Sequence, residues 1–357
     1  MQNLSKVKEN LFNYLSKRKE KFNKYLFKSV EKISVGLDIG SSLVKLVKIK
    51  FLKEKFEILD FNTATAQTDL TPVLKAMIKP KFGEKINLSV SGPATIIRYI
   101  RFPNINDNEL KQTLQFEASK HIPFAVSEVN VGGHILKKDL PDNKMLILLA
   151  AAKKEAINQR MQLLEEVGLT ANIIDLDSLA LINAFNFNYL QDNNLKSKAV
   201  ALLNIGALIT NLNIIEDGIP LLSRDIYMAG NNFTQKISDM LELDFRSAEK
   251  LKLNPDKERL DKVIVAIESV LSNLTNEIRT SFDYYESQGS SSVAKIYLSG
   301  GGSLFAGLKD MLANQLGIEV EYWDPLRQIS LTENIDSEKL KIFSNQLGVA
   351  VGLALRS

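Results

Sequence analysis

Alternating apolar and polar positions predict two strand pairs, each joined by a tight turn, at two distant places in the chain. The first pair covers residues 35–47 and the second covers residues 202–212. In each pair an apolar run ends at a polar side chain, Asp38 in the first and Asn204 in the second. Small residues fill the turns, namely Gly40, Ser41 and Ser42 in the first and Gly206 and Ala207 in the second. Such turns let backbone N–H groups approach an anion, so the repeated pattern predicts a clamp for a polyphosphate between two related domains.

A third apolar strand leads into three consecutive glycines, Gly300, Gly301 and Gly302, and then into a helical pattern. Backbone without side chains can lie flat against a base or a ribose. Each of the three motifs alone is commonly an ordinary turn or a flexible connection. Their order along the chain, strand-turn-strand twice and then strand-glycines-helix, predicts a nucleotide cleft.

The remaining pattern predicts an α/β chain with an inserted subdomain. A helix is expected to begin at residues 106–109, which have the spacing of a capping box, and to end before Pro123. A last helix over residues 344–355 is expected to pack back on the first domain. The predicted organisation is a basic helix over 1–32, a first domain over 33–85 and 167–196 closed by 340–357, an inserted recognition subdomain over 86–166, a second domain over 197–229 and 294–339, and a helical subdomain over 230–293.

The composition limits the chemistry that the chain can carry out. A chain of 357 residues that is 45% hydrophobic can bury the cores of two or three domains. The absence of cysteine excludes disulfides, a thiol nucleophile and a cysteine metal site. The two histidines, His121 and His134, cannot form a zinc site by themselves. No apolar run approaches the ~20 residues of a membrane-spanning helix, so we do not expect an integral membrane protein.

The net charge of +3 hides a concentration of basic residues at the N-terminus. Residues 1–32 hold nine basic and three acidic side chains, a net charge of +6. With helical spacing, most of their apolar residues fall on one stripe and most lysines fall elsewhere, which predicts a basic amphipathic helix. Such a helix could lie on an anionic membrane surface, bind a partner, or remain a solvated tail, and the pattern leaves these three open.

The order of the three glycine motifs is that of the two phosphate loops and the adenosine motif in the superfamily of actin, heat-shock ATPases and sugar kinases, so the chain resembles an actin-like ATPase. More selective stretches accompany them: Arg98 with Phe102-Pro103, Phe116-Glu117-Ala118 with Ile122-Pro123-Phe124, Arg224-Asp225-Ile226 with Gly230-Asn231 and Thr234, Ala248-Glu249-Lys250-Leu251-Lys252, and Leu298-Ser299 before the glycines with Gly307-Leu308 after them. On these stretches, which span nearly all of residues 33–355, the sequence resembles the PilM family of type IV pilus assembly.

The resemblance implies an α/β actin-like fold, in which two ribonuclease-H-like domains surround a cleft for ATP or ADP with Mg²⁺. Transferred residue by residue, the family's nucleotide-binding positions are Asp38, Gly40, Ser41, Ser42 and Lys45 in the first phosphate loop, Gly206 and Ala207 in the second, Gly230 and Asn231 near the ribose and phosphates, Glu249 and Lys252 near the ribose and base, and Gly300, Gly301 and Gly302 at the adenosine. It also implies catalytic work for Asp38 and Asn204, and contact of Asp38 with Mg²⁺ through a water molecule. Without the resemblance, Glu249 and Lys252 would be read as an ordinary i,i+3 surface ion pair.

Two positions depart from the pattern of the related sequences. Asn204 stands where they usually have Asp, and Ala229 stands where they usually have a second glycine. The two loop aspartates of the superfamily organise the waters of Mg²⁺ and the attacking water, whereas Asn accepts a hydrogen bond without supplying negative charge. We therefore expect at most slow ATP hydrolysis. The simpler interpretation, that Asn204 caps a turn, is compatible with this expectation.

The resemblance implies a scaffold on the inner face of the cytoplasmic membrane that binds the N-terminal tail of a PilN-like membrane protein. The alternative is an FtsA-like cell-division protein, which shares the fold and has an insert at the same place. Proteins of that type typically carry a membrane helix at the C-terminus, whereas the amphipathic candidate here is at the N-terminus. A small-molecule kinase would require a carboxylate aimed at an acceptor, and no segment indicates one. Self-association stays open, and no nucleic-acid partner is expected.

Overall fold

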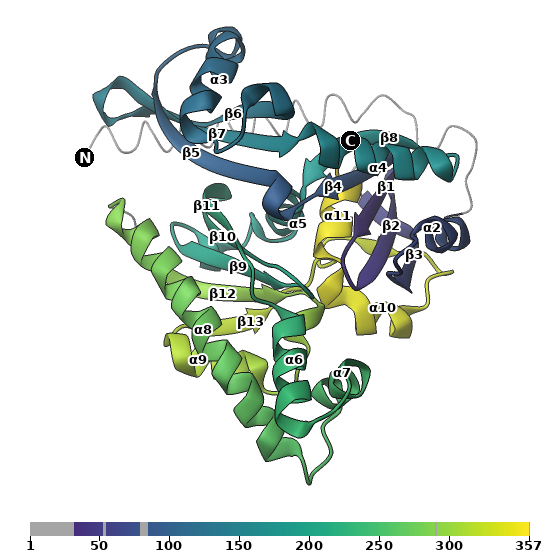
Figure 1. The fold of residues 1–357 in the computed structure, drawn as a ribbon. Helices are drawn as coiled ribbons and strands as arrows, with labels where there is room; N and C mark the ends of the chain where they lie inside the picture. Colours follow the sequence, from purple (N-terminus) through teal and green to yellow (C-terminus); the bar gives the residue numbers. More distant parts are fainter. Residues whose placement is uncertain (1–31, 53–54, 79–84, 290, 357) are drawn as a thin grey trace.

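The computed structural model describes residues 32–52, 55–78, 85–289 and 291–356. Two α/β halves lie beside each other, and a smaller subdomain lies above the second half (Figure 1). The predicted basic helix falls on residues 1–31, which are outside the described residues. Within the described ranges, no helix is both long and apolar enough to cross a membrane.

The first half is built on a six-stranded sheet in the order β14-β3-β2-β1-β4-β8. Strands β1, β2 and β3 are antiparallel neighbours, whereas β4 and β8 run parallel to β1. The strands are β1 (Lys32–Ile39), β2 (Leu43–Leu52), β3 (Lys55–Thr65), β4 (Lys85–Val90), β8 (Thr170–Leu176) and β14 (Ser330–Leu331). The helices are α2 (Thr71–Met77), α4 (Lys154–Glu166), α5 (Asp177–Tyr189), α10 (Ser337–Phe343) and α11 (Gly348–Ala354). One apolar cluster joins the sheet to α2 and α4, and another joins it to α5 and α11.

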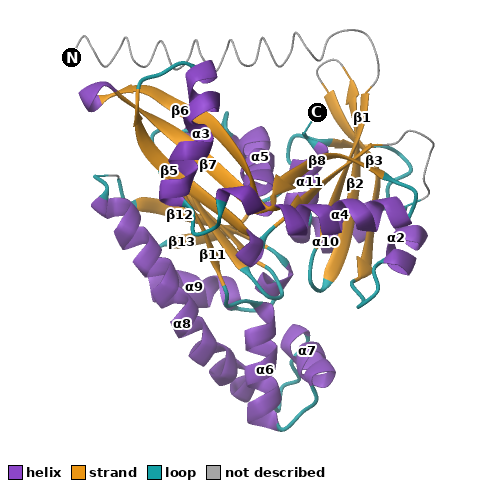
Figure 2. Ribbon diagram, turned by 45° about the horizontal axis from the view of Figure 1, so that its top comes forward, coloured by secondary structure: helices purple, strands orange, loops and turns teal. Residues whose placement is uncertain are grey.

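The second half repeats this strand arrangement in a five-stranded sheet, β11-β10-β9-β12-β13. Three antiparallel strands are again followed by two parallel ones. The strands are β9 (Ala199–Ile205), β10 (Thr210–Glu216), β11 (Ile219–Ile226), β12 (Val293–Ser299) and β13 (Glu319–Tyr322). The helices are α6 (Gly230–Leu241), α7 (Phe245–Leu253), α8 (Leu260–Ser287) and α9 (Leu308–Leu316). Figure 2 shows α6, α7 and the first turns of α8 projecting away from the sheet. The sequence-predicted duplication is therefore present in the backbone.

Helices α5 and α11 lie between the two sheets and share one apolar cluster with both of them. Two glycines allow the close approach that this packing needs. A Cβ on Gly352 of α11 would lie 1.8 Å from the carbonyl oxygen of Ala180 in α5, and a Cβ on Gly36 of β1 would lie 2.0 Å from the carbonyl oxygen of Ala350. The expected packing of the C-terminal helix on the first domain is observed, although residues 344–346 form a 3-10 turn and the regular helix, α11, begins at Gly348.

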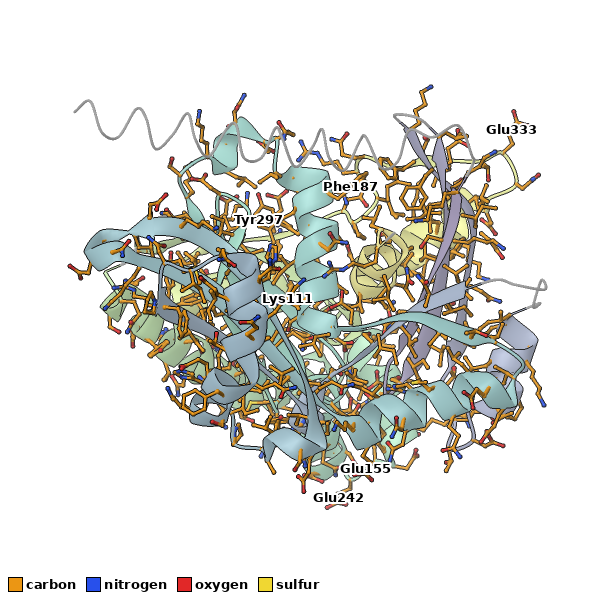
Figure 3. All side chains as sticks on the ribbon, turned by 90° about the horizontal axis from the view of Figure 1, so that it is seen from above. Lys111, Glu155, Phe187, Glu242, Tyr297 and Glu333 are labelled. Atoms are coloured by element: carbon orange, nitrogen blue, oxygen red, sulfur yellow. The ribbon has the colours of Figure 1, made fainter. Side chains whose placement is uncertain are left out.

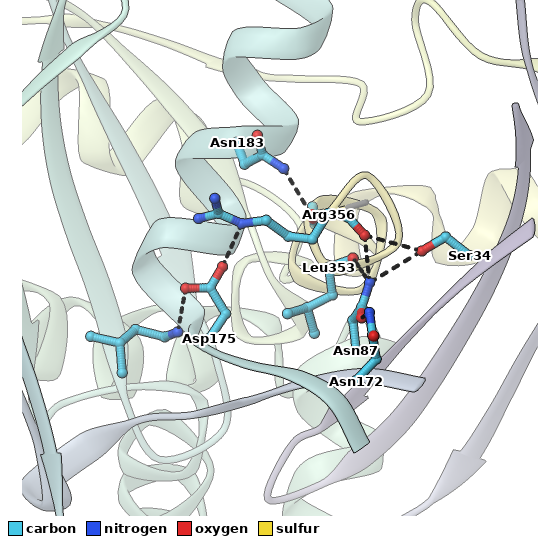
Figure 4. Close-up of polar contacts among 9 residues, drawn as sticks. Ser34, Asn87, Asn172, Asp175, Asn183, Leu353 and Arg356 are labelled. Carbon is cyan, nitrogen blue, oxygen red and sulfur yellow. Dashed lines mark hydrogen bonds and ion pairs between the residues drawn. The ribbon is translucent and has the colours of Figure 1, made fainter. Parts of the chain in front are cut away.

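Buried polar groups fix the end of α11 on the first sheet (Figure 4). Asn87 Nδ2 donates to the carbonyl oxygens of Leu353 and Arg356, at 2.9 and 2.6 Å. Arg356 Nε also donates to Asp175 Oδ2 at 2.6 Å. Because Asn87 is on β4 and is 1% exposed, these bonds tie the last described residues to the centre of the first half.

The inserted subdomain is a three-stranded antiparallel sheet, β5-β7-β6, covered by α3 and with its own apolar core. Its elements are β5 (Thr95–Pro103), α3 (Asp107–His121), β6 (Val129–Leu140) and β7 (Lys144–Lys153). The predicted capping box is present, because Asn106 accepts from the backbone N–H of Glu109 and the Glu109 side chain accepts from that of Asn106. The helix ends one residue before Ile122, which has an extended conformation and precedes Pro123, as predicted.

The insert is shorter than the predicted residues 86–166. Strand β4 belongs to the first sheet, where it pairs with β1 and β8. Helix α4 also belongs to the first half, because Leu164 is fully buried in the cluster under that sheet. The insert proper therefore extends from residue 95 to residue 153. The C-terminal part of the chain also returns to the first half earlier than expected, since β14 pairs with β3.

Candidate functional site

The first hairpin joins β1 and β2 and places opposite charges side by side. Asp38 is the cross-strand partner of Lys45, whose Nζ lies 2.5 Å from Asp38 Oδ2, and both side chains are largely buried. The Gly40 N–H closes the turn on the carbonyl oxygen three residues later, at 3.2 Å. Ser41 and Ser42 form the exposed tip, and no group among the described residues accepts a hydrogen bond from their backbone N–H groups. These two N–H groups are therefore available to an anion.

A second carboxyl group faces this hairpin from the first residue of α5. Burial, and then repulsion from Asp38, raise the pKa of Asp177 to about 6, whereas hydrogen bonds from Ser89 and Ser91 and the charge of Lys45 act in the opposite direction. Sequence reasoning missed Asp177. A signal was present, because the residue is an acid that directly follows an apolar strand and begins a helix.

Arg160 of α4 adds a second cation to this group. Its Nη2 donates to the carbonyl oxygen of Ile39 at 3.4 Å, next to the turn glycine. Burial lowers the pKa of Arg160, while the charges of Asp177 and Asp38 raise it. Two carboxylates and two cations therefore face each other at the first hairpin. Sequence reasoning missed Arg160 because it assigned α4 to the insert.

The second hairpin, between β9 and β10, begins a ladder of polar side chains. Asn204 Oδ1 accepts from Ser299 Oγ at 3.2 Å, and Asn204 Nδ2 donates to Asn211 Oδ1 at 3.1 Å. Asn211 Nδ2 donates in turn to Asp225 Oδ1 at 2.7 Å. The other oxygen of Asp225 accepts from the backbone N–H of Gly92 at 3.2 Å, so the ladder crosses from the second half to the first. Asn204 is thus one member of a side-chain network, and both of its polar atoms are engaged.

Asp225 is the carboxylate of this second group. Burial raises its pKa, and the hydrogen bonds from Asn211 and Gly92 lower it. No lysine or arginine of the described residues forms an ion pair with it. Its hydrogen-bond partners are therefore neutral amides. Because both of them donate to Asp225, every hydrogen bond between Asn204 and Asp225 must point from donor to acceptor toward Asp225.

The glycines of the second and third motifs bring backbone against backbone. Gly230 N–H donates to the carbonyl oxygen of Gly206 at 3.0 Å, and a Cβ on Gly302 would lie 2.4 Å from that same oxygen. Gly300 has a φ of 91°, and a Cβ there would lie 2.3 Å from the carbonyl oxygen of Ile205. These glycines were predicted to approach a ligand. Their close contacts with the second hairpin already require the absence of side chains.

Two further predicted residues take part in the same contacts. Asn231 N–H donates to the carbonyl oxygen of Ala207 at 2.8 Å, which joins the start of α6 to the tip of the second hairpin. A Cβ on Gly301 would lie 2.9 Å from Gln346 Oε1 in the turn before α11. The third motif therefore touches both the second hairpin and the C-terminal segment.

Glu249 and Lys252 of α7 are placed at the start of α6. Lys252 Nζ donates to the Gly230 carbonyl oxygen at 3.2 Å, to Thr234 Oγ1 at 2.8 Å and to Glu249 Oε2 at 2.7 Å. Its side chain is 3% exposed, and this burial lowers the pKa of Lys252. All three ammonium hydrogens are used within the protein, so Lys252 joins α6 to α7. Glu249 is 38% exposed and keeps an accessible carboxylate.

The predicted loop and glycine residues lie at the carboxyl ends of β1, β9 and β12, and Glu249 and Lys252 of α7 reach the second of these loops through Gly230. Residues 89–92 lie between the two hairpins, because Ser89 and Ser91 contact Asp177 whereas Gly92 contacts Asp225. A crevice at the carboxyl ends of parallel strands is the usual ligand position in α/β sheets. Across the described ranges, no three acidic or histidine side chains are placed to hold a metal ion by themselves.

Two halves with one repeated strand order, each with a glycine-containing hairpin at the carboxyl end of its first strand, define an actin-like ATPase fold. The solved structure of the ethanolamine utilization protein EutJ from Carboxydothermus hydrogenoformans has this fold, with a TM-score of 0.53, 14% identity, and coverage of 91% of this chain and 90% of that chain. A chain of the PilM–PilN type IV pilus biogenesis complex is more similar, with a TM-score of 0.80, 26% identity, and coverage of 90% and 98%.

The model of the type IV pilus assembly protein PilM family matches residues 36–357. The chain belongs to this family. The predicted fold class is confirmed, and family membership favours the pilus scaffold over the FtsA-like and kinase alternatives.

Proposed function

We propose that this protein is an ATP-binding scaffold of the type IV pilus assembly platform, on the inner face of the cytoplasmic membrane, where it holds the N-terminal tail of a PilN-like protein. The observation that carries this proposal is the similarity to a chain of the PilM–PilN complex, which extends over 98% of that chain. ATP and the cytoplasmic tail of a membrane protein are both accessible at this location.

The donor groups around the two hairpins fit a nucleotide. The tip N–H groups of Ser41 and Ser42 and the cations of Lys45 and Arg160 suit phosphate oxygens, and the accessible carboxylate of Glu249 suits ribose hydroxyls. Mg²⁺ usually binds through one or two carboxylates together with substrate phosphates and water, and it supplies positive charge at the phosphate oxygens. Asp38 is the carboxylate that would hold it, through water.

We expect ATP to bind and to be hydrolysed slowly, because Asn204 supplies no negative charge and both of its polar atoms are engaged. Calorimetry with ATP and Mg²⁺ should show binding, and phosphate release should stay below ~1 s⁻¹. Glu249→Gln should weaken ATP binding, whereas Glu268→Gln, the same change on the exposed face of α8, should leave it unchanged. Faster turnover would contradict slow hydrolysis, and absence of binding would refute the nucleotide assignment.

The insert is the proposed recognition element for the partner peptide. On α3 it carries Phe116, which is 68% exposed, with Lys120 Nζ 4.4 Å from the ring centroid. Exposed aromatic side chains are frequent anchors of protein interfaces. A synthetic peptide from the N-terminus of the PilN-like protein should bind with micromolar or tighter affinity, about −8 kcal/mol.

The variant Phe116→Ala should weaken this binding by ~10-fold or more. Phe245→Ala is the matched control, since it removes an exposed phenylalanine from α7 in the second half. If the wild-type protein does not bind the peptide, the partner assignment fails. If both variants bind it equally well, the insert helix is not the contact surface.

The basic residues 1–32 are proposed to attract the protein to anionic lipid. Their net charge of +6 predicts vesicle binding that weakens as salt is added, because screening shortens the reach of the lysine charges. The full chain should sediment with anionic vesicles, whereas a protein that lacks residues 1–32 should remain in the supernatant. Equal sedimentation of the two proteins would refute this role.

A further inference from the structure

The insert is joined by its chain to the first half and packs against it, since Ile97 and Ala152 share a small apolar cluster with Val90 of β4. It also contacts the second half. Strand β5 contacts β11, where Tyr99 and Ser223 share a hydrogen bond of 2.7 Å between their hydroxyl groups. Figures 1 and 3 both place the insert, with Lys111 on its helix, over the second half. The second contact lies at the start of the insert, where Gly92 N–H donates to Asp225.

Little space remains at this second contact. Gly92 has a φ of 74°, and a Cβ on it would lie 2.9 Å from Ile209 Cδ1 of the second hairpin. From Asp225 the polar ladder continues to Asn204 at the end of β9. The segment just before the insert is therefore packed against the hairpin assigned above to the phosphates, and Asp225 of β11 connects the two by hydrogen bonds.

The connection from this contact to the insert sheet is short. Residues Gly92–Ala94 form a single 3-10 turn, and β5 begins at Thr95. A displacement of the second hairpin therefore reaches β5 through three residues. Tyr99, within β5, is attached to the same half through Ser223. These two polar attachments couple the insert to the second half, in addition to its apolar packing on the first half.

We propose that Asp225 is a positioning residue that couples the insert to the second half, so that a nucleotide held between the hairpins shifts the insert relative to the first half, on which it also packs. This inference rests on the proposed function, because ATP is the ligand and the peptide is the readout. A ligand that favours one interdomain angle then favours one position of the insert. A peptide that contacts the insert and the first half together is sensitive to that position.

Three variants separate the parts of this arrangement. Asp225→Ala removes the acceptor of both Gly92 and Asn211. Asp225→Asn keeps the shape but has one acceptor, so it can serve Gly92 or Asn211 but not both. Tyr99→Phe removes only the hydroxyl of the other attachment. Asp283→Ala, on the exposed face of α8, is the control.

Hydrogen exchange of the full chain tests the attachment directly. Without nucleotide, the Gly92 amide should exchange ~10-fold faster in Asp225→Ala than in the wild type. In Asp283→Ala its exchange rate should equal that of the wild type. Mg²⁺ and ATP should slow exchange in residues 91–102 of the wild type and have no such effect in Asp225→Ala. Unchanged exchange in Asp225→Ala and Asp225→Asn would overturn the proposal. If the Ala variant does not fold, the effect of ATP on peptide affinity in Asp225→Asn decides the outcome, because that variant loses one of the two bonds whichever partner it serves.

Peptide affinity tests the coupling. In the wild type, Mg²⁺ and ATP should change the dissociation constant of the peptide about 5-fold or more. In Asp225→Ala, the ratio of the dissociation constants without and with ATP should be close to one. In Tyr99→Phe this ratio should lie between those of Asp225→Ala and the wild type. The same ratio in Asp225→Ala and wild type, or no effect of ATP in the wild type, would overturn the coupling. A wild type that binds no ATP refutes the proposed function and the coupling together, while the nucleotide-free exchange still decides whether Asp225 holds the insert.

Discussion

Swapping the side chains at the two ends of the polar ladder, with Asn204→Asp and Asp225→Asn, tests the direction of its hydrogen bonds. Asn204 donates to Asn211, which donates to Asp225, which also accepts from Gly92. In Asn204→Asp, the new oxygen faces Asn211 Oδ1. Turning the Asn211 amide over relieves this contact but brings its oxygen against Asp225. Either way two acceptors face each other, so the single variant should be destabilised.

The magnitude follows from the number of bonds lost. A partly buried polar group left without its partner costs about 1–3 kcal/mol, so Asn204→Asp should lower the free energy of unfolding by about 2 kcal/mol. Asp225→Asn should cost a similar amount, because its NH₂ group faces either the Gly92 N–H or the Asn211 NH₂. In the double variant the Asn211 amide turns over once and every donor again has an acceptor. Its stability should therefore lie within about 1 kcal/mol of the wild type, with a coupling energy of about 3 kcal/mol.

Urea denaturation followed by tryptophan fluorescence can measure this cycle. Trp323 is the only tryptophan of the chain, is 1% exposed, and lies in the apolar cluster between the two sheets. The double variant has the composition and net charge of the wild type, so overall charge cannot explain a rescue. Additive costs, with the double variant as unstable as the sum of the singles, would refute the ladder. The double variant is also the cleaner test of hydrolysis, because it places a carboxylate at position 204 without breaking the network.

Three further predictions concern the first half. Gly352→Ala should destabilise the protein by about 1–3 kcal/mol, because the new Cβ would lie 1.8 Å from the Ala180 carbonyl oxygen; an unchanged urea midpoint would contradict it. Asn87→Ala should cost about 1–3 kcal/mol in the same assay, because the carbonyl groups at the end of α11 lose their buried donor. The carboxyl of Asp177 should titrate by NMR with a pKa of about 6, and Asp38→Asn should move that pKa toward the ordinary value of about 4. Because the folded pKa is raised, this carboxyl contributes stability below pH about 4 that is lost as the pH rises through about 6.

The sequence predicted the elements whose signals are local. The two hairpins around Gly40 and Gly206 follow from short apolar runs interrupted by small residues, and the start of α3 follows from the capping spacing of Asn106 and Glu109. The repeated strand order of the two halves was expected from the resemblance and is present in both sheets. These features depend on residues that are close in sequence, or on motifs whose order is visible without knowledge of contacts.

The boundaries of the insert could not be predicted in the same way. Strand β4 and strand β5 have similar apolar patterns, and only their partners differ, since β4 pairs with β1 whereas β5 pairs with β7. Pairing between distant strands leaves little trace in one sequence. Helix α4 was misplaced for the same reason, and Arg160 was therefore not assigned to the first hairpin.

The roles of the glycines and of the carboxylates could not be predicted from the sequence either, because they depend on contacts that only the structure shows. A glycine that faces a ligand and one that faces a carbonyl oxygen give the same sequence signal, so the contact of Gly302 with Gly206 could not be distinguished from a contact with adenosine. Asp225 stood in a family-like stretch without an assigned task. Its link to Gly92 spans 133 residues and both halves, and no periodicity predicts it.

The ladder gives the departure at position 204 a physical meaning beyond a missing charge. A carboxylate at Asn204 would favour positioning of an attacking water, but it would also face Asn211 and break the hydrogen bonds that end at the start of the insert. With Asp225 in place, one position cannot serve both purposes. Under the proposed function, a neutral amide at position 204 keeps the second hairpin connected to the insert and is expected to lower the capacity for hydrolysis. A protein whose task is to hold a partner according to its bound nucleotide benefits from both effects, because slow turnover lengthens the lifetime of each nucleotide state.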